Sequence, residues 1–176
     1  MKQIKTPLKN VKIDKSLRTI DRCLSWFFAY PKTKIGLTEL SKYIKSSKTA
    51  TKQAVESLIK IQFLNREIIG KAWLLSANQK HIYFTTKKIS YNLNMIYESG
   101  IIDAIYKKIS SPRAIILFGS YRWGTDIEES DIDMAVEVID DKNLQIIRLG
   151  VIEQIGYRKN VPVNLHIFSR NKIDLN

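Results

Sequence analysis

Two aspartates separated by one residue, Asp131 and Asp133, are the side chains of this sequence best suited to chemistry. They open an apolar segment typical of a strand, and side chains two positions apart on a strand project from the same face. Two carboxylates held side by side repel each other unless a cation lies between them. Hard oxygen ligands of this kind suit Mg²⁺, above all next to phosphate oxygens. The pair therefore predicts a magnesium site with Asp131 and Asp133 as the metal ligands.

A second feature, Gly119-Ser120, directly follows the apolar run Ala114–Phe118. Glycine lets the backbone approach a phosphate closely, serine adds a hydroxyl donor, and the start of the helix expected here offers free N–H groups. Either feature alone is common, as a turn or as an acidic surface strand. Together they predict a phosphoryl-transfer site in which Gly119 and Ser120 bind phosphate.

The segment from Leu117 to Val138, LFGSYRWGTDIEESDIDMAVEV, resembles the DNA polymerase β-like minimal nucleotidyltransferases. The pattern of that family is an apolar strand ending in Gly-Ser, a further glycine, and then Ser-Asp-apolar-Asp. Gly124 and Ser130 complete the pattern here. The resemblance covers roughly residues 98–168 and implies a mixed sheet flanked by helices.

The resemblance also implies an activity. Members of this family bind a nucleoside triphosphate, here expected to be ATP, and transfer its nucleotidyl group to an acceptor hydroxyl with loss of pyrophosphate. Asp131 and Asp133 would hold two Mg²⁺ ions, one lowering the pKa of the attacking hydroxyl and the other stabilising the leaving pyrophosphate. Gly119 and Ser120 would hold the β- and γ-phosphates, and Ser130 would contribute to nucleotide binding.

One position departs from the family pattern. The third carboxylate of the family lies on the next strand, where this sequence has Asn164. An amide oxygen can coordinate a metal ion, so Asn164 is a candidate third ligand, but an amide carries no charge and cannot act as a base. We therefore expect reduced or absent turnover unless another residue substitutes. His166, on the same face as Asn164, and Glu137, about 13 Å along the strand from Asp133, are the candidates.

Apolar spacing around the motif predicts alternating helices and strands, and hence an α/β or α+β fold. The expected elements are a helix over 101–109, strands over 114–118 and 131–138, a helix over 143–155 and a strand over 161–168. The prediction of the second helix rests on Leu144, Ile147, Val151 and Ile155, which recur at three- and four-residue steps.

The N-terminal part has a different pattern. Helices are expected over 16–29, over 38–44 with Thr38 as its cap, and over 48–60 with Ser47 as its cap; strands over 63–69 and 72–75 follow as a hairpin. Over about residues 16–76 this order of three helices and a β-hairpin resembles the winged helix-turn-helix family. The alternative is a protein-interaction module of the same fold. The residues that would face the DNA groove or its phosphates are Ser47, Lys48, Thr49, Thr51, Lys52, Gln53 and Lys71.

Charge divides the chain in the same way. Residues 1–97 contain 19 Lys and Arg against 5 Asp and Glu, a net charge of +14, whereas residues 98–176 contain 10 against 12, a net charge of −2. A basic N-terminal part predicts a polyanionic partner, duplex DNA above all, although a lysine-rich solvated surface would have the same composition. We expect a DNA-binding domain over 1–76, a connecting helix or arm over 77–97 and the nucleotidyltransferase domain over 98–176.

Composition also limits the class of protein. A content of 44% hydrophobic and 26% charged residues is ordinary for a globular protein. The apolar cluster Leu24–Tyr30 is much shorter than the roughly 20 residues of a membrane span, and no secretory signal follows the basic start. The sequence therefore predicts a cytoplasmic protein without membrane contact. The single cysteine, Cys23, is expected to be a buried apolar side chain.

Three functions fit these observations. The leading hypothesis is a DNA-binding protein that transfers a nucleotidyl group to a hydroxyl of a partner protein or of RNA, as in prokaryotic toxin–antitoxin and defence systems. The second is a transcriptional regulator whose nucleotide-binding domain is weakly active or inactive, which Asn164 favours. The third is an RNA-modifying enzyme whose basic part holds tRNA. A homodimer is a further expectation, because helix-turn-helix proteins often bind DNA as dimers.

Overall fold

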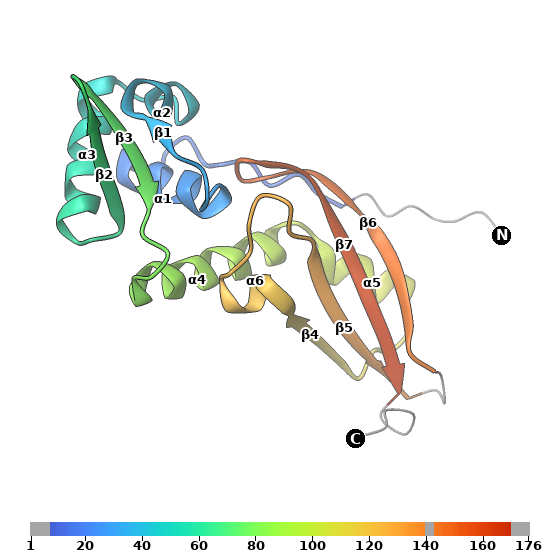
Figure 1. The fold of residues 1–176 in the computed structure, drawn as a ribbon. Coiled ribbons are helices and arrows are strands. Elements are labelled where there is room, and N and C mark those ends of the chain that lie inside the picture. Colours follow the sequence, from blue (N-terminus) through green and yellow to red (C-terminus); the bar gives the residue numbers. More distant parts are fainter. Residues whose placement is uncertain (1–7, 140–142, 170–176) are drawn as a thin grey trace.

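The computed structural model describes residues 8–139 and 143–169 of the 176-residue chain. These residues form two units that meet along a long helix (Figure 1). The elements of the first unit are α1 (Thr19–Ala29), β1 (Ile35–Gly36), α2 (Leu37–Tyr43), α3 (Lys48–Lys60), β2 (Leu64–Ile69) and β3 (Ala72–Ala77). The second unit follows with α4 (Ile82–Glu98), α5 (Ile101–Lys108), β4 (Ala114–Phe118), α6 (Gly119–Trp123), β5 (Ile132–Val138), β6 (Gln145–Ile155) and β7 (Arg158–Ser169).

In the first unit, three helices pack together beside a small antiparallel sheet with strand order β1-β3-β2. The apolar face of α1 meets that of α3, so that Phe27, Val55 and Leu58 share one buried core. Cys23 is fully buried in the same core, as the sequence predicts. The helices and the hairpin lie where the apolar spacing places them, because each presents one apolar face to this core.

The starts of α2 and α3 differ from each other. Ser47 caps α3 as predicted, since its hydroxyl accepts a hydrogen bond from the Ala50 amide at 3.1 Å. The prediction that Thr38 caps α2 is wrong. That helix begins at Leu37 directly after β1, and Thr38 is exposed within its first turn. Pairing of Gly36 with Leu74 in the sheet brings the chain straight from strand to helix and leaves no room for a separate cap.

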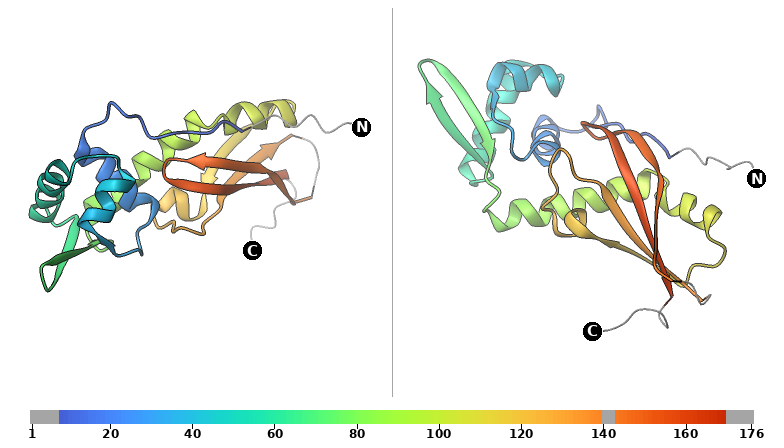
Figure 2. Two further views of the ribbon diagram at one scale, coloured as in Figure 1. Left: turned by 90° about the horizontal axis from the view of Figure 1, so that it is seen from above. Right: turned by 45° about the vertical axis from the view of Figure 1, so that its right-hand side comes forward.

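The second unit is built on a four-stranded sheet with strand order β4-β5-β7-β6. The β4–β5 and β6–β7 pairs are antiparallel and the central β5–β7 pair is parallel, so the sheet is mixed. Helices α4 and α5 lie against one face of it (Figures 1 and 2). Together with the first unit this is a mixed α+β architecture, which confirms the predicted class.

The predicted helix over residues 143–155 is wrong, because this segment forms strand β6. Its apolar residues do fall at helical spacing, but β-branched side chains such as Ile146 and Val151 fill the segment and favour a strand. The whole of β6 pairs with β7, with a bulge between Arg148 and Gly150 that shifts the register. Tertiary pairing therefore overrides a spacing that is ambiguous by itself.

Helix α4 belongs to both units. Its first turn places Phe84 in the core of the first unit, while Met95 and Ile96 near its end lie in the core of the sheet. The connecting segment expected over 77–97 is thus mainly one helix that packs on both sides. Within residues 8–139 and 143–169, no helix is both long and apolar enough to cross a membrane.

The two faces of the sheet have different environments. On β5, Ile132, Met134 and Val136 point towards α4 and α5 and are buried. The alternate residues of β5 project from the other face together with their neighbours on β4 and β7. We call this second face the open face and define it by Phe118, Asp133, Ala135, Asn164 and His166.

Candidate functional site

Three adjacent strands bring the predicted chemical groups to one end of the open face. Phe118, the last residue of β4, pairs with Asp133 on β5, and Asp133 pairs with Asn164 on β7. Residues paired across a sheet project from the same face. Asp131 directly precedes β5, two positions before Asp133. Asn164 is 33 residues from Asp131 and 31 residues from Asp133 in sequence, yet it is a neighbour of both aspartates in the fold.

Asn164 is hydrogen-bonded to both aspartates. Its side-chain Nδ2 donates to Oδ2 of Asp131 at 3.0 Å and to Oδ1 of Asp133 at 3.3 Å. An amide donor between two carboxylates reduces their mutual repulsion without adding a full positive charge. A carboxylate at position 164 would instead bring a third negative charge into the same space. The substitution that breaks the family pattern thus gives the site a group that stabilises the aspartate pair.

Gly119 lies against the carboxylate of Asp133. Its φ of +69° is in the left-handed region, where residues with a Cβ are strained. A Cβ built on Gly119 would come within 3.1 Å of Oδ2 of Asp133. The backbone turn and the close approach both require glycine here, and the turn brings the chain beside Asp133 immediately after β4.

The two serines of the motif have different surroundings. Ser120 is half-buried in the first turn of α6, and its hydroxyl has no hydrogen-bond partner among the residues that the structure describes. The Ser130 hydroxyl instead accepts the Ile127 amide at 2.9 Å and closes a turn within the preceding loop. The structure therefore leaves the Ser120 hydroxyl available to a ligand, whereas that of Ser130 has a partner inside the loop.

The two candidate substitutes for the missing carboxylate lie at different ends of the sheet. Nε2 of His166 is 3.7 Å from Oδ1 of Asp133, and its ring packs edge-on against Phe118 at 4.8 Å between centroids. Glu137 pairs with Ala114 on β4, and its carboxylate lies 3.8 Å from the Arg113 guanidinium. His166 is therefore part of the site, and Glu137 is not.

One basic residue of the open face carries no sequence signal. Arg148 on β6 pairs with Asn164, which places its exposed side chain on the same face as the aspartates. The error in predicting β6 as a helix hid this position, because only the strand register brings Arg148 beside Asn164.

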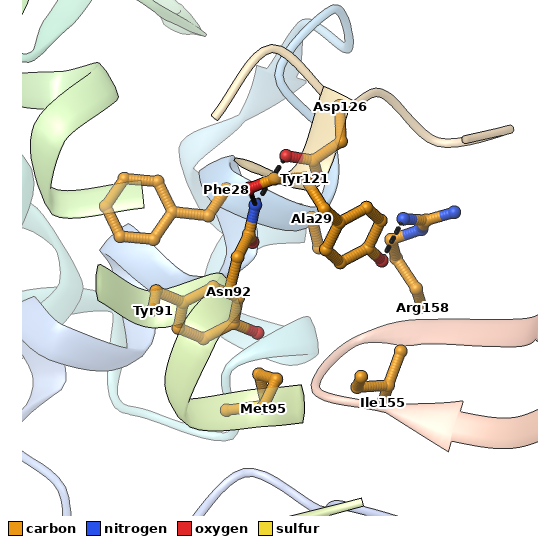
Figure 3. A pocket seen from close by; sticks show the side chains of 9 residues that line it. All are labelled: Phe28, Ala29, Tyr91, Asn92, Met95, Tyr121, Asp126, Ile155 and Arg158. Carbon is orange, nitrogen blue, oxygen red and sulfur yellow. Dashed lines mark hydrogen bonds between the residues drawn. The ribbon is translucent and has the colours of Figure 1, made fainter. Parts of the chain in front are cut away.

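Sequence reasoning also missed a group of buried polar residues behind the site. Asp126 and Arg158 line a small pocket under the loop that leads to Asp131, together with Asn92 on α4 and Tyr121 on α6 (Figure 3). Burial raises the pKa of the Tyr121 phenol above its usual value, so Tyr121 stays neutral. No local pattern distinguishes these residues from ordinary surface charges.

The donor set fits a hard divalent cation. Two carboxylates are ligands that Mg²⁺ accepts, and Asn164 would add its amide oxygen once its side-chain amide, whose Nδ2 faces both aspartates, is turned over. Within the described part of the chain, no group of three or more His, Cys, Asp and Glu side chains is arranged to hold a metal ion. A cation at Asp131 and Asp133 would therefore take the rest of its coordination from water and phosphate oxygens, as Mg²⁺ does with nucleotides.

The predicted nucleic-acid residues of the first unit, with one exception, are exposed. Thr51 is fully buried, and its hydroxyl donates to the Ser47 carbonyl at 2.8 Å, so the prediction that it faces DNA is wrong. It lies on the same side of α3 as Val55 and Leu58, and bonding to the carbonyl four residues earlier satisfies its hydroxyl inside the core. The exposed members are Ser47, Lys48, Thr49, Lys52 and Gln53 on α3 or its cap, and Lys71 at the hairpin turn.

Comparison with known proteins bears on the second unit. Residues 101–176 match the family model described as Polymerase beta, Nucleotidyltransferase. No curated protein and no solved structure shows a significant match to the chain. The matched region contains the Gly119-Ser120 turn, both aspartates and Asn164. Residues 101–176 are therefore similar to nucleotidyltransferases of the polymerase β type.

Proposed function

We propose that this protein binds a Mg²⁺–nucleoside triphosphate on the open face and transfers its nucleotidyl group to an acceptor hydroxyl. The observation that carries the proposal is the meeting of Gly119, Asp131 and Asp133 at one end of the sheet. The family match to residues 101–176 supports the same chemistry. ATP is the triphosphate we expect, and a hydroxyl of a protein or of RNA is the expected acceptor.

In the proposed reaction, the acceptor oxygen forms a bond to the α-phosphorus of the triphosphate. The bond from that phosphorus to the bridging oxygen breaks, and pyrophosphate leaves with the electron pair. Asp131 and Asp133 would hold the Mg²⁺, which neutralises phosphate charge when bound. The Ser120 hydroxyl and the backbone around Gly119 would orient the β- and γ-phosphates, and Arg148 supplies a cationic side chain on the same face.

The acceptor hydroxyl must transfer its proton to a base during the reaction. Asn164 cannot take it, because an amide is not a base at neutral pH. His166 can accept a proton at Nε2, and its position 3.7 Å from Asp133 would then stabilise the imidazolium. We therefore assign to His166 the role of general base, either directly or through one water molecule.

Asn164 favours a second function from a different class. The amide already satisfies both carboxylates through its N–H groups, which lowers the demand for a metal ion. A domain of this kind could bind nucleotide without turning it over, and the protein would then be a DNA-binding regulator with an inactive transferase domain. Asn164→Asp distinguishes the two functions, because it restores the family's carboxylate and removes the donor.

We also propose that the first unit is a winged helix that binds duplex DNA. The short turn between α2 and α3, the exposed polar residues at the start of α3 and the β2–β3 hairpin support this assignment. Trp73 on β3 contacts two cations, with Nζ of Lys52 5.3 Å and the Arg66 guanidinium 4.5 Å from the centre of its ring. This stacking fixes two basic side chains on one surface that joins α3 to the hairpin.

The test of transfer uses triphosphates labelled at the α-phosphate, with Mg²⁺ or Mn²⁺ and cell lysate. We expect label on a protein or an RNA, and loss of that label in Asp131→Asn/Asp133→Asn. Glu129→Gln is the matched control, because it removes an exposed carboxylate from the adjoining loop. Transfer that survives in the double variant would refute the active site. Absence of transfer in the native protein, with gain in Asn164→Asp, would establish the inactive regulator.

The test of DNA binding measures the affinity for a labelled duplex at rising salt. Binding through phosphate contacts weakens steeply with salt, with a slope of about 0.9 per contact on logarithmic axes. A flat salt dependence would contradict recognition through phosphates. Tighter binding of a structured RNA than of the duplex would favour the RNA-modifying function instead.

A further inference from the structure

The loop that delivers Asp131 to the site is held from below by buried charges. We call residues 125–131 the site loop. Beneath it, Lys88 on α4, Asp126 in the loop itself and Arg158 on β7 are exposed by only 1%, 2% and 5%. Charged side chains are almost never buried this deeply unless they are paired. Three of them in one place point to a specific structural task.

Two side chains of α4 bind the beginning of the site loop, at Asp126. Nζ of Lys88 lies 3.2 Å from Oδ2 of Asp126 and also donates to the main-chain oxygen of that residue. Asn92, one turn further along α4, donates to Oδ1 of Asp126 at 2.6 Å and to the Tyr121 carbonyl at 3.2 Å. Both carboxylate oxygens of Asp126 are thus fixed by one helix.

Arg158 binds the end of the site loop. Its two terminal nitrogens donate at 2.5 Å, one to the Tyr121 hydroxyl and the other to the main-chain oxygen of Ser130. Figure 3 shows Arg158 beside Tyr121 and, across the pocket, Asn92 reaching Asp126. Ser130 immediately precedes Asp131, so Arg158 fixes the peptide group from which the first metal-binding aspartate extends.

The site loop has further attachments without a buried charge: Asn164 on β7 donates to Asp131 at 3.0 Å, and the Thr125 amide donates to the Ser120 carbonyl on α6. Thr33 donates to Glu128 at 2.9 Å in an exposed position, where water competes for the bond. The Ser130 hydroxyl holds a turn within the loop but ties it to nothing else. The buried charges add the connection of the loop to α4, and they hold its main chain at Asp126 and at Ser130.

We propose that Lys88, Asp126 and Arg158 form a positioning cluster that fixes Asp131 in the geometry needed to bind the metal–nucleotide. Burial of an ion pair is by itself weak evidence for stability, since packed apolar residues often do as well. The hydrogen bonds that Lys88 and Arg158 donate to the main-chain oxygens of Asp126 and Ser130 are directional, however, and they specify where the loop lies. This inference rests on the proposed function, because it assigns Arg158 and Asp126 a role in the same site.

The test compares neighbouring residues that differ in burial. Arg158→Met removes the buried guanidinium, and Lys159→Met is its matched control, because Lys159 is exposed on the same strand. Lys88→Met and Lys87→Met form the corresponding pair on α4. Arg158→Lys is a third variant, which keeps the charge but can replace only one of the two donors.

The first readout is hydrogen exchange of the full-length protein without nucleotide. Three amides report on the site loop, since Thr125 donates to the Ser120 carbonyl, Ile127 to the Ser130 hydroxyl and Ser130 to the Ile127 carbonyl. We expect faster exchange at these amides in Arg158→Met while the amides of β5 and β7 keep their protection. Unchanged loop exchange, or an equal increase throughout the sheet, would overturn the proposal.

The second readout is the Mg²⁺ concentration that supports half-maximal binding of a fluorescent ATP analogue. Loss of a residue that orients a metal ligand typically costs roughly 10- to 100-fold, and we expect that increase in Arg158→Met, a smaller one in Arg158→Lys and none in Lys159→Met. An unchanged Mg²⁺ requirement in Arg158→Met would contradict the positioning role. Failure of the native protein to bind the analogue would refute the proposed function, and the exchange experiment would still decide whether the cluster holds the loop.

Discussion

The two units of this protein use charged residues in opposite ways. The net positive charge of the chain lies in residues 1–97, which include the first unit, and the lysines on α3 and at the hairpin turn are exposed to solvent. The second unit has nearly balanced charge, but Lys88, Asp126 and Arg158 are buried beneath its site loop. Exposed charges act together through a long-range field, whereas buried ones act through individual contacts. The same substitution should therefore have small, additive effects in one unit and large, local effects in the other.

The largest expected effect is on stability. Lys88→Met leaves the Asp126 carboxylate buried without its cation, and breaking such a pair typically costs about 3–5 kcal/mol. Urea denaturation of the variant should show this loss. Lys87→Met, one position away and exposed, should stay within about 0.5 kcal/mol of the native protein. Equal losses in the two variants would abolish the distinction between buried and exposed charges.

A second prediction separates backbone strain from damage to the site. Gly119→Ala and Gly70→Ala both place a Cβ at positive φ, which costs about 1–2 kcal/mol in each case. Only at Gly119 does the new methyl group meet the Asp133 carboxylate, because nothing lies within 4 Å of the corresponding Cβ at Gly70. We expect similar thermal destabilisation of both variants but loss of Mg²⁺-dependent nucleotide binding in Gly119→Ala alone. Normal nucleotide binding by Gly119→Ala would remove Asp133 from the site.

A third prediction concerns alkaline pH. Burial raises the pKa of the Cys23 thiol to about 12 from 9.0 in the first unit, and that of the Tyr157 phenol to about 12 from 10.0 in the second. Between the ordinary and the raised value, the unfolded chain has released the proton and the folded chain has not. Stability should therefore fall as pH rises above 9, by up to about 1.4 kcal/mol per pH unit for Cys23. Tyr157 should add a weaker fall above pH 10, because its side chain is partly exposed and water screens the effect.

Cys23→Ala isolates the thiol in this experiment. Its unfolding free energy, measured by urea denaturation from pH 8 to 10.5, should fall less steeply with pH than that of the native protein. The alanine leaves a small cavity and lowers stability at every pH, so the slope is the informative quantity. An identical slope in the two proteins would show that Cys23 titrates normally in the fold.

The smallest effect is expected on the basic surface. Lys52→Ala should weaken duplex binding uniformly across DNA sequences and reduce the salt slope by about 1. Lys60→Ala, an exposed lysine at the opposite end of the same helix, is the control and should leave both quantities unchanged. Equal losses of duplex affinity in the two variants would indicate that the whole positive surface attracts DNA without a defined contact surface.

The sequence predicted those parts of the protein in which local pattern and tertiary contact agree. Ser47 caps α3 as expected, and the Gly-Ser turn falls at the end of β4, because both depend on residues close in sequence. Asp131 and Asp133 were predictable as a pair since a strand places them on one face. These residues lie within the region 101–176, which is similar to the nucleotidyltransferase family model.

The predictions from the sequence are wrong or incomplete where pairing with a distant strand, or burial in the fold, determines the structure. Leu144 to Ile155 has helical spacing, and only β7 makes it a strand. Thr51 looked like a surface residue, but the rotation of α3 set by Val55 and Leu58 turns it inward. Lys88, Asp126 and Arg158 are ordinary charged residues in sequence, and their burial depends on how α4 and β7 enclose the site loop.

The parallel pairing of β5 with β7 has a consequence for the order of folding. An intervening strand, β6, separates these partners along the chain. The two aspartates therefore meet Asn164 only after a segment of more than 30 residues has folded and brought β7 beside β5. The first unit closes through shorter hairpins and helix contacts, and such local contacts form faster. The core of the first unit can therefore form while the edge of β5 that pairs with β7 is still unpaired. The end of the sheet that carries the two aspartates should be the last part to assemble, and the strands around it the first to aggregate if assembly is delayed.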